Sequence, residues 1–227
     1  MVSKLNRKKI LYFLIIVGNV QFIILTIIAM SFYQGGTYID NTTQGYLFWY
    51  NYFSDLGRTL AHSGIPNVIS WILFTIALTL WGIFQIPFYI AFPKFFSRSK
   101  NLKILSAYGS IFGIFAGVCY VGIAFTPSDL LDNWHDFFVF LGFGSIFLSN
   151  FFYSIVIFLD KNYSNFYAKI LIISVVILGV YFFILAFTQN INIIIKLFVY
   201  VSGQKLMMYT LLICGIIQGY GAIRQER

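Results

Sequence analysis

The chain has 227 residues, of which 59% are hydrophobic, 21% are aromatic and only 10% are charged. Soluble domains carry roughly 25% charged residues, so this composition excludes a globular protein whose surface is kept in water. The net charge of +8 does not indicate nucleic-acid binding, because the basic residues occur in short clusters between apolar runs, as membrane topology signals do. The sequence therefore predicts an integral membrane protein whose partner is membrane lipid and not nucleic acid.

Six apolar segments are each long enough to cross a membrane. A hydrocarbon core of about 30 Å needs roughly 20 helical residues at 1.5 Å per residue. The predicted helices cover residues 10–33, 65–92, 102–126, 134–159, 167–188 and 193–222. The first exceeds the roughly 7–15 apolar residues of a secretory signal, so we expect it to be retained. With short connections throughout, the chain is predicted to form one all-α domain over residues 1–227, an integral membrane bundle of six transmembrane helices.

Three of these segments carry local packing signals. Asn19 and Gln21 lie inside the first, where polar side chains are expected to bond to a neighbouring helix. Pro87 is expected to kink or end the second. The third has glycines at every fourth position, which predicts a smooth face for a closely packed helix or, alternatively, a groove for a ligand chain. These glycines are Gly109, Gly113 and Gly117.

The charge pattern predicts the orientation in the membrane. Of the 15 Lys and Arg residues, 12 fall at residues 4–9, 94–103, 161–169 and 224–227, with only Asp160 and Glu226 beside them. The connections on the other side carry three basic and five acidic residues. The positive-inside rule then places both termini in the cytoplasm. We expect the protein to lie in the plasma membrane.

The rest of the chain is arranged around the stretch YLFWYNYFSDLGRTLAHSG at residues 46–64. Its polar members are Ser54, Asp55, Arg58 and His62. If the stretch is helical, these residues share one face and Asp55 pairs with Arg58 three residues away. The alternative is an aromatic interface belt followed by a helix cap and a surface ion pair.

Two further polar stretches fall on the same predicted side of the membrane. In TPSDLLDNWHD, Asp129 lies in an acidic loop, and a contact from Asp132 would hold the His135 imidazole in one tautomer. Gln204 and Lys205 are candidates for ligand binding near the start of the last helix. The alternatives are an interfacial histidine that caps a helix and a lysine that snorkels to the outer leaflet.

Asp55 and His135 are expected to share one site, because both lie at the outer ends of helices in a narrow bundle. Three functions fit the polar and aromatic residues predicted on this side of the membrane. The first is lipid binding by the basic and aromatic groups, and the second is hydrolysis or group transfer on a lipid, with Asp55 or His135 activating water and Arg58 or Lys205 holding the oxyanion. The third is a small-molecule or proton-coupled transporter.

A catalytic zinc ion is also a candidate, although no HExxH or HxH spacing supports it. Its ligands would come from His62, His135, Asp55 and Asp129. Walker, Rossmann, haem-attachment and G-x-S-x-G signatures are missing, so nucleotide binding and the standard hydrolase folds have no support.

FSDLGRT, followed by Pro66 and a long apolar segment, resembles the Ser-Asp-Leu-Gly opening of the second helix in the domain of unknown function 998 family. GIAFTPSD with His135 is similar to that family's Gly-x-Phe-Pro-x-Asp and downstream histidine, except that Thr126 stands before the proline. GQK, placed before the last helix, resembles its third element. The autophagy modulator (DRAM) and Frag/Sfk-like proteins look more distantly alike. The resemblance implies a six-helix bundle with Ser54, Asp55, Asp129 and His135 at family-like positions, and a role in membrane lipid handling.

Overall fold

The computed structural model describes residues 4–188 and 190–226. Over these residues the chain forms six long α-helices, each long and apolar enough to span a membrane, which confirms the predicted all-α bundle. They are α1 (Lys4–Ser31), α2 (Val68–Ala91), α3 (Lys100–Ala124), α4 (Asp132–Leu159), α5 (Asn165–Phe187) and α6 (Ile193–Gln225). Two short 3-10 helices flank α2, namely η1 (Ser54–Gly57) and η2 (Phe92–Phe96).

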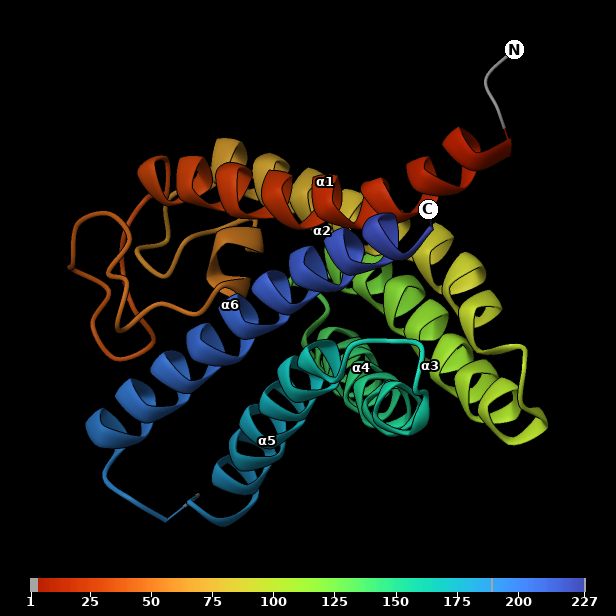
Figure 1. Cartoon of the computed structure of the whole chain (residues 1–227). Coiled ribbons are helices and arrows are strands. Elements are labelled where there is room, and N and C mark those ends of the chain that lie inside the picture. The colour runs from red at the N-terminus through yellow and green to blue at the C-terminus, as the bar shows by residue number, and fades with distance from the viewer. Residues whose placement is uncertain (1–3, 189, 227) are drawn as a thin grey trace.

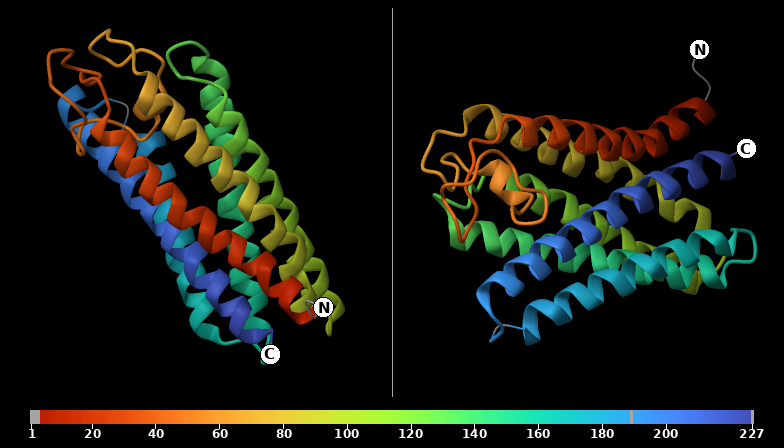
Figure 2. Two further views of the ribbon diagram at one scale, coloured as in Figure 1. Left: turned by 90° about the horizontal axis from the view of Figure 1, so that it is seen from above. Right: turned by 90° about the vertical axis from the view of Figure 1, so that its left-hand side faces the viewer.

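Successive helices run in opposite directions, so the connections gather at two ends of the bundle (Figures 1 and 2). The two termini lie at one end, together with the α2–α3 and α4–α5 connections. The long α1–α2 connection and the α3–α4 loop lie at the opposite end. At the terminal end, Lys8 forms an ion pair with Glu226 and ties α1 to α6. The basic clusters therefore share one end of the bundle, and their cytoplasmic placement stays a prediction.

The glycine face of α3 packs closely against its neighbours, as predicted. A β-carbon on Gly117 would lie 2.7 Å from the carbonyl oxygen of Gly82 on α2. At Gly113 it would lie 2.6 Å from the ring of Tyr89, and at Gly109 it would meet a tyrosine of α4. A side chain at any of these positions would push the helices apart, so the glycines set the spacing of α2, α3 and α4.

The observed helix ends lie within three residues of the predicted ones, except that α1 begins six residues earlier. Asn19 and Gln21 bond to α2, as expected: the Asn19 side-chain oxygen accepts from the Trp81 indole at 3.0 Å, and Gln21 donates to the Ala77 carbonyl at 2.9 Å. Pro87 lies inside α2 and does not end it. The GQK triplet lies within α6 and not before it.

The segment between α1 and α2, residues 32–67, folds over one end of the bundle and is called the cap. The condition under which the polar residues of the stretch 46–64 would share a helix face is not met, because only the four residues of η1 are helical there. The Asn51 side chain accepts from the Leu47 backbone N–H at 2.9 Å, and Asp55 accepts from the Tyr52 N–H at 2.9 Å. Such side-chain bonds compete with helical ones and favour turns.

Candidate functional site

A cavity of about 880 Å³ lies between the cap and the adjoining parts of α4, α5 and α6. Its polar lining comes mainly from the cap and the first turns of α4, and its apolar lining from further along α4, α5 and α6. The wall carries the charged, imidazole and amide side chains of Asp55, Arg58, His62, Asp132, His135, Asp136 and Gln204. Hydroxyl groups on the wall come from Ser54, Ser128, Tyr38, Tyr52, Tyr181 and Tyr200. A second cavity, between α1, α2, α4 and α6, measures about 30 Å³, which is room for about one water.

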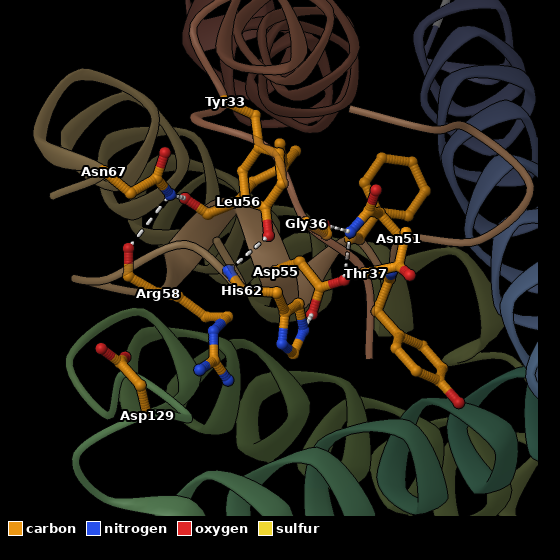
Figure 3. Close-up of polar contacts among 12 residues, drawn as sticks. Tyr33, Gly36, Thr37, Asn51, Asp55, Leu56, Arg58, His62, Asn67 and Asp129 are labelled. Carbon is orange, nitrogen blue, oxygen red and sulfur yellow. Dashed lines mark hydrogen bonds and ion pairs between the residues drawn. The ribbon is translucent and has the colours of Figure 1, made fainter. Parts of the chain in front are cut away.

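Asp55 is the most heavily hydrogen-bonded group of the cavity wall. It lies in η1 and is only 4% exposed. One carboxylate oxygen accepts from the Asn51 side-chain amide at 3.0 Å and from the Tyr52 N–H at 2.9 Å. The other lies 3.1 Å from Nε2 of His62 (Figure 3). Asn51 also donates to the Gly36 carbonyl at 2.8 Å, so this cluster ties distant parts of the cap together.

His62 is the direct partner of Asp55, a pairing that was not predicted from the sequence. A carboxylate accepts hydrogen bonds, so Nε2 of His62 carries the proton and Nδ1 is the basic nitrogen of the neutral ring. The backbone N–H of His62 donates to the Tyr33 hydroxyl at 3.2 Å, which fixes the residue from a second side. Burial, and after it the nearby Asp55 charge, raises the pKa of Tyr33, so this hydroxyl stays protonated.

Arg58 does not pair with Asp55, contrary to the predicted i,i+3 contact. η1 ends at Gly57 and the backbone becomes extended at Arg58, with φ −74° and ψ 142°, so the two side chains are not on one helix face. Nε of Arg58 donates to the Leu60 carbonyl at 3.1 Å. The terminal guanidinium nitrogens have no hydrogen-bond partner among the described residues, and the side chain lines the cavity.

His135 lies on the same cavity, near the start of α4. The side chain is 5% exposed, and Nδ1 lies 2.7 Å from the carbonyl oxygen of Thr126. A carbonyl only accepts, so Nδ1 donates and Nε2 is left free of described partners. The tautomer is therefore fixed by Thr126. The predicted contact from Asp132 is not formed. Asp55 and His135 line one cavity but make no hydrogen bond to each other.

Asp129 lies outside the cavity lining. Its carboxylate accepts from the Thr59 hydroxyl at 2.5 Å and from the backbone N–H groups of Thr59 and Leu60 at 3.0 and 2.9 Å. It thus joins the α3–α4 loop to the cap. Burial alone would raise the pKa of Asp129, but these hydrogen bonds outweigh it and lower the pKa. Their stabilising effect is present at neutral pH and is lost as the pH falls through the lowered pKa.

Lys205 also lies apart from the cavity and is neither a ligand-binding group on its wall nor a snorkelling lysine. It is 2% exposed, and its ammonium group donates to the Asn51 carbonyl oxygen. The ammonium nitrogen lies 4.9–5.5 Å from the ring centres of Tyr46, Phe48 and Phe53. Lys205 therefore fastens the cap to α6. The neighbouring Gln204 does line the cavity, and its side-chain oxygen accepts from the Phe53 N–H at 2.9 Å.

The four candidate zinc ligands do not converge. Among the described residues, no three His, Cys, Asp or Glu side chains are placed to hold a metal ion. Asp129 bonds to Thr59 and Leu60, and Asp55 has its two oxygens on His62, Asn51 and Tyr52.

Several residues of the cavity wall were not singled out from the sequence. Asp136, next to His135, could have been found as the fourth residue after Asp132 on one helix face. The apolar wall carried no local signal, because its residues resemble the lipid-facing ones of the same helices. These residues are Val139, Phe140 and Phe143 of α4, Phe182, Leu185 and Ala186 of α5, and Met207 of α6.

Comparisons of the chain with protein-family models, with curated proteins and with solved structures give no match. The resemblance to the domain of unknown function 998 family therefore stays a prediction. The structure identifies the chain as a multipass integral membrane protein with six candidate spans.

Proposed function

We propose that this protein binds a membrane lipid in the cavity beneath the cap. The headgroup lies against the polar side chains of the cap and the start of α4. An acyl chain lies against the apolar side chains of α4, α5 and α6. The observation that carries the proposal is that one cavity joins a polar wall to an apolar wall.

The size and depth of the cavity fit such an amphipathic ligand. Its volume of about 880 Å³ falls within the roughly 300–1,000 Å³ of sites for small organic ligands. The lining residues of α4 extend from Asp132 to Phe143, a rise of about 16 Å along the helix. That depth accommodates several methylene groups of an acyl chain below the headgroup.

We infer that the cavity also opens toward the lipid-facing surface of the bundle. Phe140 lines the cavity, yet it is 72% exposed on the surface of α4. A lipid can therefore enter sideways from the bilayer, without its acyl chain passing through water. Such an entry avoids a loss of about 0.8 kcal/mol for each methylene group that would otherwise be exposed.

Replacing Val139 by Trp should fill the apolar part of the cavity and reduce lipid retention several-fold. Val139 lines the cavity, whereas Val180, on α5, is exposed and does not line it. Lipid extracted from gently purified protein would be measured by mass spectrometry for wild type, Val139→Trp and the matched control Val180→Trp. Equal lipid per protein in all three, with unchanged melting temperatures, would refute binding in the cavity.

A lipid hydrolase or transferase is the second candidate, and the contact between Asp55 and His62 favours it. In this mechanism Asp55 holds the Nε2 proton, and Nδ1 of His62 takes a proton from water as the hydroxide adds to a lipid ester carbonyl. The same proton then passes to the alcohol that leaves. Turnover of a phospholipid by wild type, abolished in His62→Asn, would establish this reaction. Retention of intact lipid without turnover would leave the protein a binder.

A further inference from the structure

We propose that the bound lipid is a zwitterionic phospholipid, whose headgroup carries a phosphate and an ammonium group as phosphoethanolamine does. This inference rests on the lipid binding proposed above and concerns the headgroup alone. It comes from charged groups of the cavity wall that have hydrogen-bonding atoms without a described protein partner.

Arg58 is the group that selects the phosphate. Among the described residues that line the cavity, it is the only Lys or Arg. Its Nε is engaged by the Leu60 carbonyl, which leaves the terminal nitrogens of a permanently charged, planar group for a ligand. A guanidinium group binds phosphate oxygens through paired, charge-assisted hydrogen bonds, whereas a neutral headgroup would leave this charge unpaired.

Asp132 and Asp136 are the groups that select the ammonium. They lie one turn apart on α4, both line the cavity, and neither carboxylate has a described hydrogen-bond partner in the protein. Two like charges at this spacing repel each other, and a cation between them relieves the repulsion. Asp55 does not compete for that cation, because its oxygens already accept from Asn51, Tyr52 and His62.

His135 gives an independent indication of a ligand at the same place. It lies on α4 between the two aspartates, is 95% buried and lines the cavity. Nδ1 is committed to Thr126, while Nε2 meets no described protein group. Nε2 is open to the cavity, so it can form a hydrogen bond to a polar atom of a ligand there. With Nδ1 donating to Thr126, Nε2 of the neutral ring is an acceptor, and an N–H of the lipid's ammonium group fits this position.

A purely anionic headgroup fits this wall poorly, because it would satisfy Arg58 but face two carboxylates. A purely cationic headgroup would satisfy the carboxylates but leave Arg58 without a partner. Only a headgroup with both charges pairs all three groups. The full-length protein in detergent should therefore retain phosphatidylethanolamine in preference to phosphatidylglycerol when both have the same acyl chains.

The test is native mass spectrometry of the protein with equal amounts of these two lipids. The double variant Asp132→Asn/Asp136→Asn should lower the ratio of bound phosphatidylethanolamine to phosphatidylglycerol by about tenfold, the effect of one charge-assisted hydrogen bond. Asp40→Asn, which changes an exposed cap aspartate outside the cavity lining, should leave the ratio unchanged. Both substitutions in the double variant are on exposed positions and nearly isosteric, so the fold should persist.

The outcomes separate the two proposals. Equal binding of both lipids by wild type, unchanged in the double variant, would overturn the headgroup assignment and leave lipid binding in place. Binding of neither lipid would overturn both proposals. Free phosphoethanolamine at the same concentration should not displace the lipid, because it lacks acyl chains, and displacement would move the ligand class to water-soluble zwitterions.

Discussion

Replacing Gly117 by Leu is expected to destabilise the bundle by about 3 kcal/mol, the upper part of the range for overpacked sites. A β-carbon at this position would lie 2.7 Å from the Gly82 carbonyl oxygen and 3.3 Å from the Ile86 side chain. The first of these contacts is with backbone, which cannot rotate away as a side chain can. The helices α2 and α3 must therefore separate, and the loss of their packing follows along the interface.

Gly144 on α4 provides the matched control for this substitution. A β-carbon there would meet nothing within 4 Å, so Gly144→Leu should be neutral or slightly stabilising because of its better helix propensity. The measurement is thermal unfolding of both variants in the same detergent. Equal melting temperatures for the two variants would show that the α2–α3 contact does not limit the packing of the bundle.

Replacing Asp55 by Ala is expected to loosen the cap while the bundle stays folded. The substitution removes the acceptor for the Asn51 amide, the Tyr52 N–H and the His62 ring. Each buried donor left without a partner costs about 1–3 kcal/mol, so the cap should lose several kcal/mol of local stability. Because η1 and His62 form part of the cavity wall, the amount of retained lipid should fall as the cap loses stability.

Hydrogen exchange measured by mass spectrometry would locate this effect. In Asp55→Ala the amides of residues 47–62 should exchange faster by one or more orders of magnitude, with α1 to α6 protected as in wild type. Asp40→Ala changes an exposed aspartate of the same cap and should leave that protection intact. Unchanged exchange in residues 47–62 of Asp55→Ala would mean that the cap does not depend on this carboxylate.

The helices could be predicted from the sequence because the bilayer sets their length and composition. Residues 10–33 must cross about 30 Å of hydrocarbon, and a single continuous α-helix of this length does so. Packing could be predicted where it depends on one residue type at a fixed spacing, as with the glycines of α3. The contacts of Asn19 and Gln21 followed because a polar side chain in lipid has few partners except another helix.

The cap could not be predicted in the same way, because its fold depends on bonds between residues far apart in the chain. Asn51 is hydrogen-bonded to Gly36, and Asp129 to Thr59. Lys205 is hydrogen-bonded to Asn51, which is more than a hundred residues away in the chain. A helical pattern suggested an Asp55–Arg58 pair, but η1 ends after four residues. The partner of His135 is a backbone carbonyl, which no sequence motif specifies.

The proposed function is tested most directly by locating a bound lipid on the protein. A phospholipid with a photoreactive acyl chain would be cross-linked to wild-type protein, and the labelled residues identified by mass spectrometry. We predict labels at the apolar lining between residues 139 and 143 of α4 and between 182 and 186 of α5, suppressed by excess unlabelled lipid. Labels spread evenly over exposed faces such as Ile24 and Ile27 of α1, and unaffected by competitor, would contradict lipid binding in the cavity.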